Sequence, residues 1–218
     1  MRTNQEYKDA ALSALKGNWA PAVVATIVFF AICLTVTGGE SLSQIWLPTT
    51  PGVLGALTGA SLVLSILIVG PVEIGYYNST KALFKNGDSA LTSNIFNFGF
   101  KNYLHNIWGF FLMTVFIVLW CLLLFIPGIV MSFAYAMTPY ILVDNPEMKA
   151  IDAIRKSKSM MKGHKFDLFY LGLSFIGWIL LGFLTLGIGY LWLIPYMQTT
   201  ISAFYEDLKM EAETGYSI

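Results

Sequence analysis

Charged residues are scarce in this sequence. Only 12% of the 218 residues are Asp, Glu, Lys or Arg, well below the share in an ordinary soluble domain, while 56% are hydrophobic. Glu40 is the single charged residue between Gly17 and Val72, and none lies between Asn102 and Val143. Apolar runs of this length are typical of bilayer spans, because about 20 apolar residues cross the hydrocarbon core. The scarcity of charge therefore excludes a soluble globular protein.

Residues that carry catalysis or bind metals are also rare. The two cysteines, Cys33 and Cys121, both lie in apolar runs, where cysteine packs as a small hydrophobe. The chain has two histidines, and it contains neither a His-Glu-x-x-His motif nor a phosphate-binding glycine loop. The formal net charge is zero, which argues against nucleic-acid binding. The sequence therefore predicts a non-enzymatic protein with no catalytic residues, no cofactor, no metal site and no nucleic-acid partner.

Long apolar segments are abundant. A window of about 19 residues finds six candidate spans, at Trp19–Thr37, Val53–Val72, Ile107–Ile126, Ile129–Val143, Phe166–Phe183 and Ile188–Phe204. All 13 basic residues precede the first span or follow the second, fourth or sixth, and an excess of basic residues marks cytoplasmic loops. We therefore predict an all-α polytopic membrane protein. Its six transmembrane helices form three hairpins, and both termini are cytoplasmic.

The predicted spans divide a single membrane domain, 1–218, into seven segments. These are a cytoplasmic amphipathic segment at 1–18, the first hairpin at 19–72, a cytoplasmic connector at 73–106, the second hairpin at 107–143, a basic amphipathic helix at 144–165, the third hairpin at 166–204 and a cytoplasmic tail at 205–218. Pro-Gly or Gly-x-Gly sequences at the outer end of each hairpin predict tight turns there.

The second helix of each predicted hairpin contains one proline, at Pro71, Pro139 and Pro195. Such a proline kinks the helix and frees the carbonyl group four residues earlier, which a neighbour must satisfy or a wet cavity must accommodate. We therefore interpret a set of polar residues near these kinks as candidates for lining a cavity or responding to ions: Glu73, Tyr140, Tyr196, Gln198 and Thr199. The alternative is that Glu73 is an interfacial residue paired with a lysine, and that the prolines and threonines serve helix packing alone.

Two cytoplasmic helices are predicted. Thr3 and Glu6 form a capping box, which predicts a short helix to about Leu15 with its apolar face on the membrane surface. The second helix begins after Asp144 with Pro146 in its first turn, and it runs to Met161. Its basic residues are candidates for contact with anionic lipid headgroups or a protein partner: Lys149, Arg155, Lys156, Lys158, Lys162 and Lys165. The alternative is a connector whose charge only fixes the topology.

Seven segments of the sequence carry a family pattern. The most specific is Ser157–Lys165, which ends in Met160-Met161-Lys162-Gly163-His164-Lys165, and the others are Lys16–Trp19, Gly70–Val72, Leu124–Ile129, Leu142–Pro146, Leu184–Gly189 and Pro195–Tyr205. Together they resemble a bacterial integral membrane family, the domain of unknown function 975, and the resemblance extends over nearly the whole chain. It implies a multi-pass protein of the bacterial plasma membrane, and it supplies no catalytic residues.

Two functions compete on this evidence. We favour a membrane scaffold, a lipid-responsive protein or an accessory to a partner complex, because ion-coupled transporters usually carry more charge within the membrane. This hypothesis predicts a dry helix bundle that contacts membrane lipids and a protein partner or a second copy of the chain. The alternative is a small transporter or channel-like protein, which predicts a polar cavity along the proline-containing helices.

Overall fold

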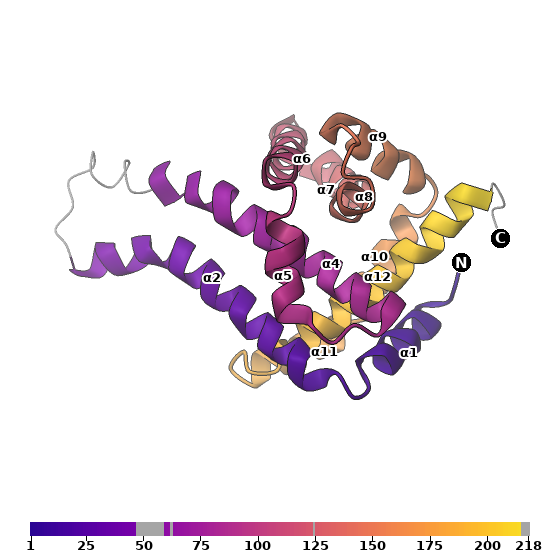
Figure 1. The fold of residues 1–218 in the computed structure, drawn as a ribbon, viewed down its shortest axis with the longest axis horizontal. Coiled ribbons are helices and arrows are strands. Elements are labelled where there is room, and N and C mark those ends of the chain that lie inside the picture. The colour runs from indigo at the N-terminus through magenta and orange to yellow at the C-terminus, as the bar shows by residue number, and fades with distance from the viewer. Residues whose placement is uncertain (47–58, 62, 124, 215–218) are drawn as a thin grey trace.

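The computed structural model describes residues 1–46, 59–61, 63–123 and 125–214, and these residues form helices and no strand (Figure 1). The helices are α1 (Asn4–Leu15), α2 (Trp19–Trp46), the π-helical turn η1 (Ser65–Val69), α4 (Gly70–Asn86), α5 (Leu91–Phe100), α6 (Tyr103–Leu123), α7 (Phe125–Tyr135), α8 (Thr138–Asp144), α9 (Ala150–Met160), α10 (Lys165–Leu173), α11 (Ile176–Leu184) and α12 (Tyr190–Thr214).

Four helical stretches are long and apolar enough to cross a membrane: Trp19–Val36, Gly59–Asn86, Tyr103–Leu122 and Lys165–Leu184. They overlap the first, second, third and fifth predicted spans and indicate a membrane protein, although the second stretch begins and ends later in the chain than predicted. The fourth predicted span, at 129–143, is instead broken into α7 and α8. The sixth lies in α12, which continues into the charged segment 206–213. The orientation of the loops and the count of six spans stay predictions.

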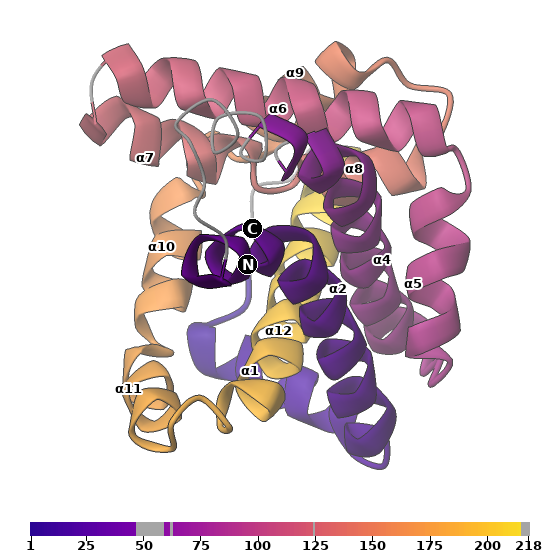
Figure 2. The ribbon, with the colours of Figure 1, turned by 90° about the vertical axis from the view of Figure 1, so that its left-hand side faces the viewer.

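The hairpins do not form a bundle of parallel helices. In Figure 1, α2 and α4 lie along the plane of the view while α6 is seen end-on. After a rotation of 90°, α6 and α7 extend across the top of the molecule (Figure 2). The hairpin of α6 and α7 therefore lies across helices α2 and α4. The predicted turn at Pro51 lies outside the described residues.

The predicted connector at 73–106 contains two helices in close contact, because α4 extends to Asn86 and α5 turns back along it. Glycines make this packing possible. A Cβ atom on Gly75 would lie 2.0 Å from the carbonyl oxygen of Ile95, and one on Gly99 would lie 2.3 Å from that of Pro71. Only a residue without a side chain lets two helix backbones approach this closely.

The three prolines have different effects. Pro71 is in the first turn of α4, directly after η1, and the freed carbonyl of Leu67 accepts a hydrogen bond from the Tyr103 hydroxyl at 2.8 Å. A neighbouring helix thus satisfies the group that the kink releases, as membrane burial requires. Pro139 begins α8 after a complete break in the helix, whereas Pro195 lies inside the continuous helix α12.

The capping box at the start of α1 is present, since the Thr3 amide donates to a Glu6 carboxylate oxygen at 2.6 Å and the Glu6 amide donates to the Thr3 hydroxyl. However, the apolar face of α1 packs on α12 and α4. The Tyr7 ring contacts that of Phe204, with centroids 5.5 Å apart, and its hydroxyl donates to Asp207 at 3.0 Å. This face contacts protein, which corrects the prediction that it lies on the membrane surface.

The basic helix starts later than predicted. α9 begins at Ala150. The backbone leaves the helical conformation at Asn145 (φ −131°, ψ 74°). A turn follows, in which the Met148 amide donates to the Asn145 carbonyl at 3.0 Å, and the helix starts only after this turn. A residue before proline is disfavoured in helical conformation, so Pro146 follows the end of α8 rather than opening the next helix. Ala153, Ile154 and other small or apolar residues of α9 face the core.

Candidate functional site

A cavity of about 310 Å³ lies among α6, α7, α8, α10 and α12, with one residue of α4 on its wall. It adjoins the two places where helices are interrupted, between α7 and α8 and between α10 and α11. Its lining is largely apolar, and among the described residues no charged side chain contributes to it. The lining residues are Tyr77, Met113, Ile117, Ser132, Phe133, Tyr135, Ala136, Pro139, Tyr140, Leu168, Leu171, Gly172, Phe175, Met197, Gln198 and Ile201.

The cavity reaches the surface of the molecule on α10. Gly172 lines the cavity and is exposed, and a Cβ atom there would meet nothing within 4 Å. Because Gly172 lies within the apolar stretch Lys165–Leu184, this mouth opens at the level of a candidate membrane span.

Tyr77, Tyr140 and Gln198 provide polar groups on the cavity wall. The Tyr140 hydroxyl donates to the Gln198 side-chain oxygen at 3.5 Å, a long hydrogen bond. The ring of Tyr140 lies 5.4 Å from that of Tyr77, centroid to centroid. A carboxamide has two N–H donors and an acceptor oxygen, so Gln198 can still hydrogen-bond a ligand.

Asp144, at the end of α8, joins the cavity wall to a cluster of charged groups. Tyr205 stacks on Tyr140 with centroids 5.0 Å apart, and its hydroxyl donates to Asp144 at 2.9 Å. The same carboxylate accepts a hydrogen bond from Lys209 at 2.7 Å and forms an ion pair with Lys81 of α4. Helices α4, α8 and α12 are thus held together by one carboxylate.

The two lysines determine the charge state of this cluster. Burial by itself would raise the pKa of the Asp144 carboxyl, but hydrogen bonds from Lys209 and Lys81 outweigh burial and hold the pKa below its ordinary value. The hydrogen bond to Asp144 in turn raises the pKa of Lys209. Asp144 is therefore a carboxylate, and Lys209 is an ammonium ion, at neutral pH.

The structure brings together only some of the predicted cavity residues. Tyr140, Gln198 and Pro139 line the cavity. Tyr196 instead lines a groove beside Trp19 and packs edge-on against Phe175, and Thr199 is buried with its hydroxyl bonded to the backbone within α12.

Glu73 lies outside the cavity and accepts a hydrogen bond from the Tyr77 hydroxyl at 2.7 Å. The sequence reasoning missed Tyr77 and Tyr205. The spacing of four residues between Glu73 and Tyr77 was an available signal, because it places both on one face of a helix. Nothing local pointed to Tyr205, whose partner Asp144 is 61 positions away.

The predicted basic residues differ in their surroundings. Lys149 and Arg155 line a groove between α6 and α9, whereas Lys162 lines a separate hollow beside His164. Lys156 and Lys158 are exposed on α9, and Lys165 is half-buried at the start of α10. Within the described residues, no group of three or more His, Cys, Asp or Glu side chains is arranged to hold a metal ion.

Comparison with known families gives one match. Residues 113–212 match a family described as "Protein of unknown function (DUF975)", so the resemblance found in the sequence is confirmed over this part of the chain. The matched region runs from within α6 to α12 and includes every residue that lines the cavity except Tyr77. No curated protein and no solved structure matches the chain.

Proposed function

We propose that this chain, whose residues 113–212 form a DUF975 domain, is a non-enzymatic, lipid-responsive membrane protein that binds an uncharged amphiphile in its interhelical cavity. The observation that carries the proposal is an apolar cavity of about 310 Å³ with phenol and carboxamide groups on its wall. The resemblance to a bacterial membrane family favours the bacterial plasma membrane as its location. Among the described residues, the lining contains one serine, Ser132, whose hydroxyl donates to the Ile129 carbonyl, and it contains no His, Cys, Asp, Glu or Lys that could activate this hydroxyl, which favours binding over chemistry.

The cavity wall indicates the class of ligand. Burying an unpaired charge costs several kcal/mol, so a wall without charged groups favours an uncharged molecule. The Gln198 side-chain amide can donate to a hydroxyl or ester oxygen, and the Tyr140 and Tyr77 hydroxyls, whose protons go to Gln198 and Glu73, can accept from a ligand hydroxyl. The remaining wall suits a hydrocarbon chain. The volume is about twice that of a 150 Å³ cavity that holds benzene. A long-chain alcohol or a similar single-chain amphiphile that places part of its chain in the cavity meets these conditions.

Photolabelling of the purified chain in detergent tests the proposal. The probe is a long-chain alcohol with a diazirine in its chain, and mass spectrometry locates the labelled peptides. We expect labels on α7, α10 and α12 of the wild-type protein. Gly172→Leu plugs the mouth of the cavity without a clash and should abolish this labelling. Gly177→Leu is the matched control, because that position on α11 is equally open but does not line the cavity.

Gln198→Leu separates the polar contact from the apolar ones. The net contribution of one hydrogen bond is about 1 kcal/mol, so this variant should need about fivefold more probe for the same labelling. Equal labelling of the cavity peptides in Gly172→Leu and Gly177→Leu would contradict the proposal.

Transport along the proline-containing helices is the second candidate, and the position of Pro139 on the cavity wall favours it. Transport requires water to reach the cavity. The variant Gln198→Cys, in a chain that also carries Cys33→Ala and Cys121→Ala, distinguishes the two functions. Reaction with a charged, membrane-impermeant thiol reagent would favour transport, whereas protection of this cysteine favours binding from the bilayer.

A further inference from the structure

A second hollow, which we call the α6–α9 groove, lies between the first turns of α6 and helix α9, apart from the cavity. Its volume is about 520 Å³. It is lined by His105, Trp108, Lys149, Ala150, Ile151, Asp152 and Arg155, none of which contributes to the cavity. The groove therefore combines cationic and apolar side chains from two helices.

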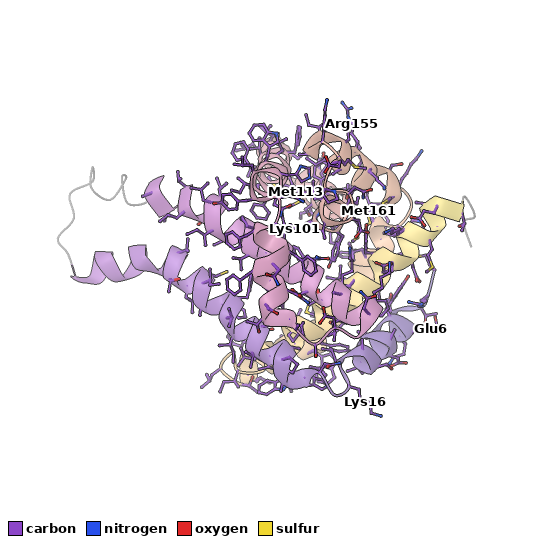
Figure 3. All side chains as sticks on the ribbon, viewed as in Figure 1. Glu6, Lys16, Lys101, Met113, Arg155 and Met161 are labelled. Atoms are coloured by element: carbon purple, nitrogen blue, oxygen red, sulfur yellow. The ribbon has the colours of Figure 1, made fainter. Side chains whose placement is uncertain are left out.

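The cationic side of the groove is available to an anion. Lys149 is exposed, and the Arg155 side chain is 77% exposed on the outer surface of α9 (Figure 3). Arg155 lies 3.5 Å from Asp152, whose side chain is 51% exposed. An exposed pair at this distance contributes little free energy, so an incoming anion can replace it as the partner of the guanidinium.

His105 adds an unused polar atom. Its Nε2 is buried and has no hydrogen-bond partner within the described part of the chain. An unsatisfied buried nitrogen is unfavourable, and a turn of the His105 ring toward the groove would let a ligand oxygen accept its proton and remove this cost. The tautomer protonated at Nε2 can donate such a hydrogen bond.

The apolar side of the groove distinguishes a lipid from a small anion. Trp108 is 57% exposed and Ile151 is 44% exposed. A tryptophan beside basic residues is typical of the interface between membrane and water. Inorganic phosphate could use only Lys149, Arg155 and His105, whereas a phospholipid could also cover Trp108 and Ile151.

We propose that the α6–α9 groove binds the phosphate group of an anionic phospholipid. Lys149 and Arg155 contact the phosphate, His105 donates from Nε2, and the start of the acyl chains packs on Trp108 and Ile151. The groove does not share a residue with the cavity, so this proposal can hold or fail independently of the proposed function.

Native mass spectrometry of the full chain in detergent tests the groove. Phosphatidylglycerol or phosphatidylcholine is added at increasing concentration, and bound lipid is counted on each variant. Lys149→Gln with Arg155→Gln removes the two groove cations, and Lys156→Gln with Lys158→Gln removes two cations of the same helix outside the groove. Two basic residues near an anionic surface together strengthen binding about thirtyfold, so we expect the first pair to weaken phosphatidylglycerol binding by roughly this factor. The second pair should leave binding within twofold.

His105→Phe and Trp108→Ala examine the other two contacts. Each should weaken phosphatidylglycerol binding while leaving the weaker binding of phosphatidylcholine unchanged. An equal loss of phosphatidylglycerol binding in the two double variants, the one that removes the groove cations and the one that removes Lys156 and Lys158, would overturn the proposal, because it would show a general charge effect. Displacement of the lipid by millimolar inorganic phosphate would also overturn it, because the apolar side of the groove would then contribute nothing.

Discussion

Replacing Asp144 with asparagine should cause a large loss of stability. The carboxylate holds Lys81, Tyr205 and Lys209, and the Lys81 side chain is only 8% exposed. Removing one partner of a buried ion pair leaves the other charge uncompensated, which costs about 3–5 kcal/mol. The Asp144 and Lys209 side chains keep some contact with solvent, at 16% and 29% exposure, so we expect the lower end, about 3 kcal/mol.

The assay is thermal unfolding of the purified chain in detergent. For a chain of this length, about 3 kcal/mol lowers the midpoint by roughly 6–12 °C. Asp152→Asn is the matched control, since its partner Arg155 is exposed and the loss should be under about 1 kcal/mol. Lys81→Met combined with Asp144→Asn should recover part of the loss by removing the uncompensated charge. Equal midpoints for the two single variants would refute the reasoning.

One further prediction concerns packing, and two concern charge. Gly75→Ala should destabilise the chain by about 1–3 kcal/mol because its Cβ would strike a backbone carbonyl, whereas Gly177→Ala, in open space, should be neutral or slightly stabilising in the same unfolding assay. Because the pKa of Asp144 is lowered in the folded protein, the carboxylate stabilises the fold at a pH above 3.8, the ordinary pKa of an aspartate, and this contribution is lost as the pH falls through the lowered pKa. The unfolding midpoints of the wild type and of Asp144→Asn should therefore converge in acid. At high pH the dependence is reversed. Because the pKa of Lys209 is raised in the folded protein, the fold loses stability as the pH rises above 10.5, the ordinary pKa of a lysine.

The sequence predicted the parts of the fold that depend on local signals. The capping box at Thr3 and Glu6 formed because its partners are three residues apart. The turn before α12 formed near Gly187, whose positive φ of 91° favours glycine. The location of a break was harder to predict, since Pro139 disrupts its helix completely while Pro195 does not. The outcome depends on which neighbours can satisfy the exposed backbone groups, and that information is not local.

The candidate sites show the same division. The sequence singled out Tyr140 and Gln198 as polar residues near kinks, but it also included Glu73, which hydrogen-bonds within its own helix. Lys149 and Arg155 were recognised by charge. The sequence could not show that His105 and Trp108 of α6 belong to the same groove, because the contact between α6 and α9 arises only when the chain folds.

The sequence by itself predicted helices apolar enough to cross a membrane, because scarce charge and long apolar runs favour the bilayer, and it showed the resemblance to the DUF975 family that residues 113–212 match. The tertiary structure decided where the chain is hollow and where its buried charge is neutralised. Both depend on helices distant in sequence, such as α4, α8 and α12 at Asp144. A hydrophobic pattern specifies which segments avoid water, but complementary shapes and paired charges specify which segments meet.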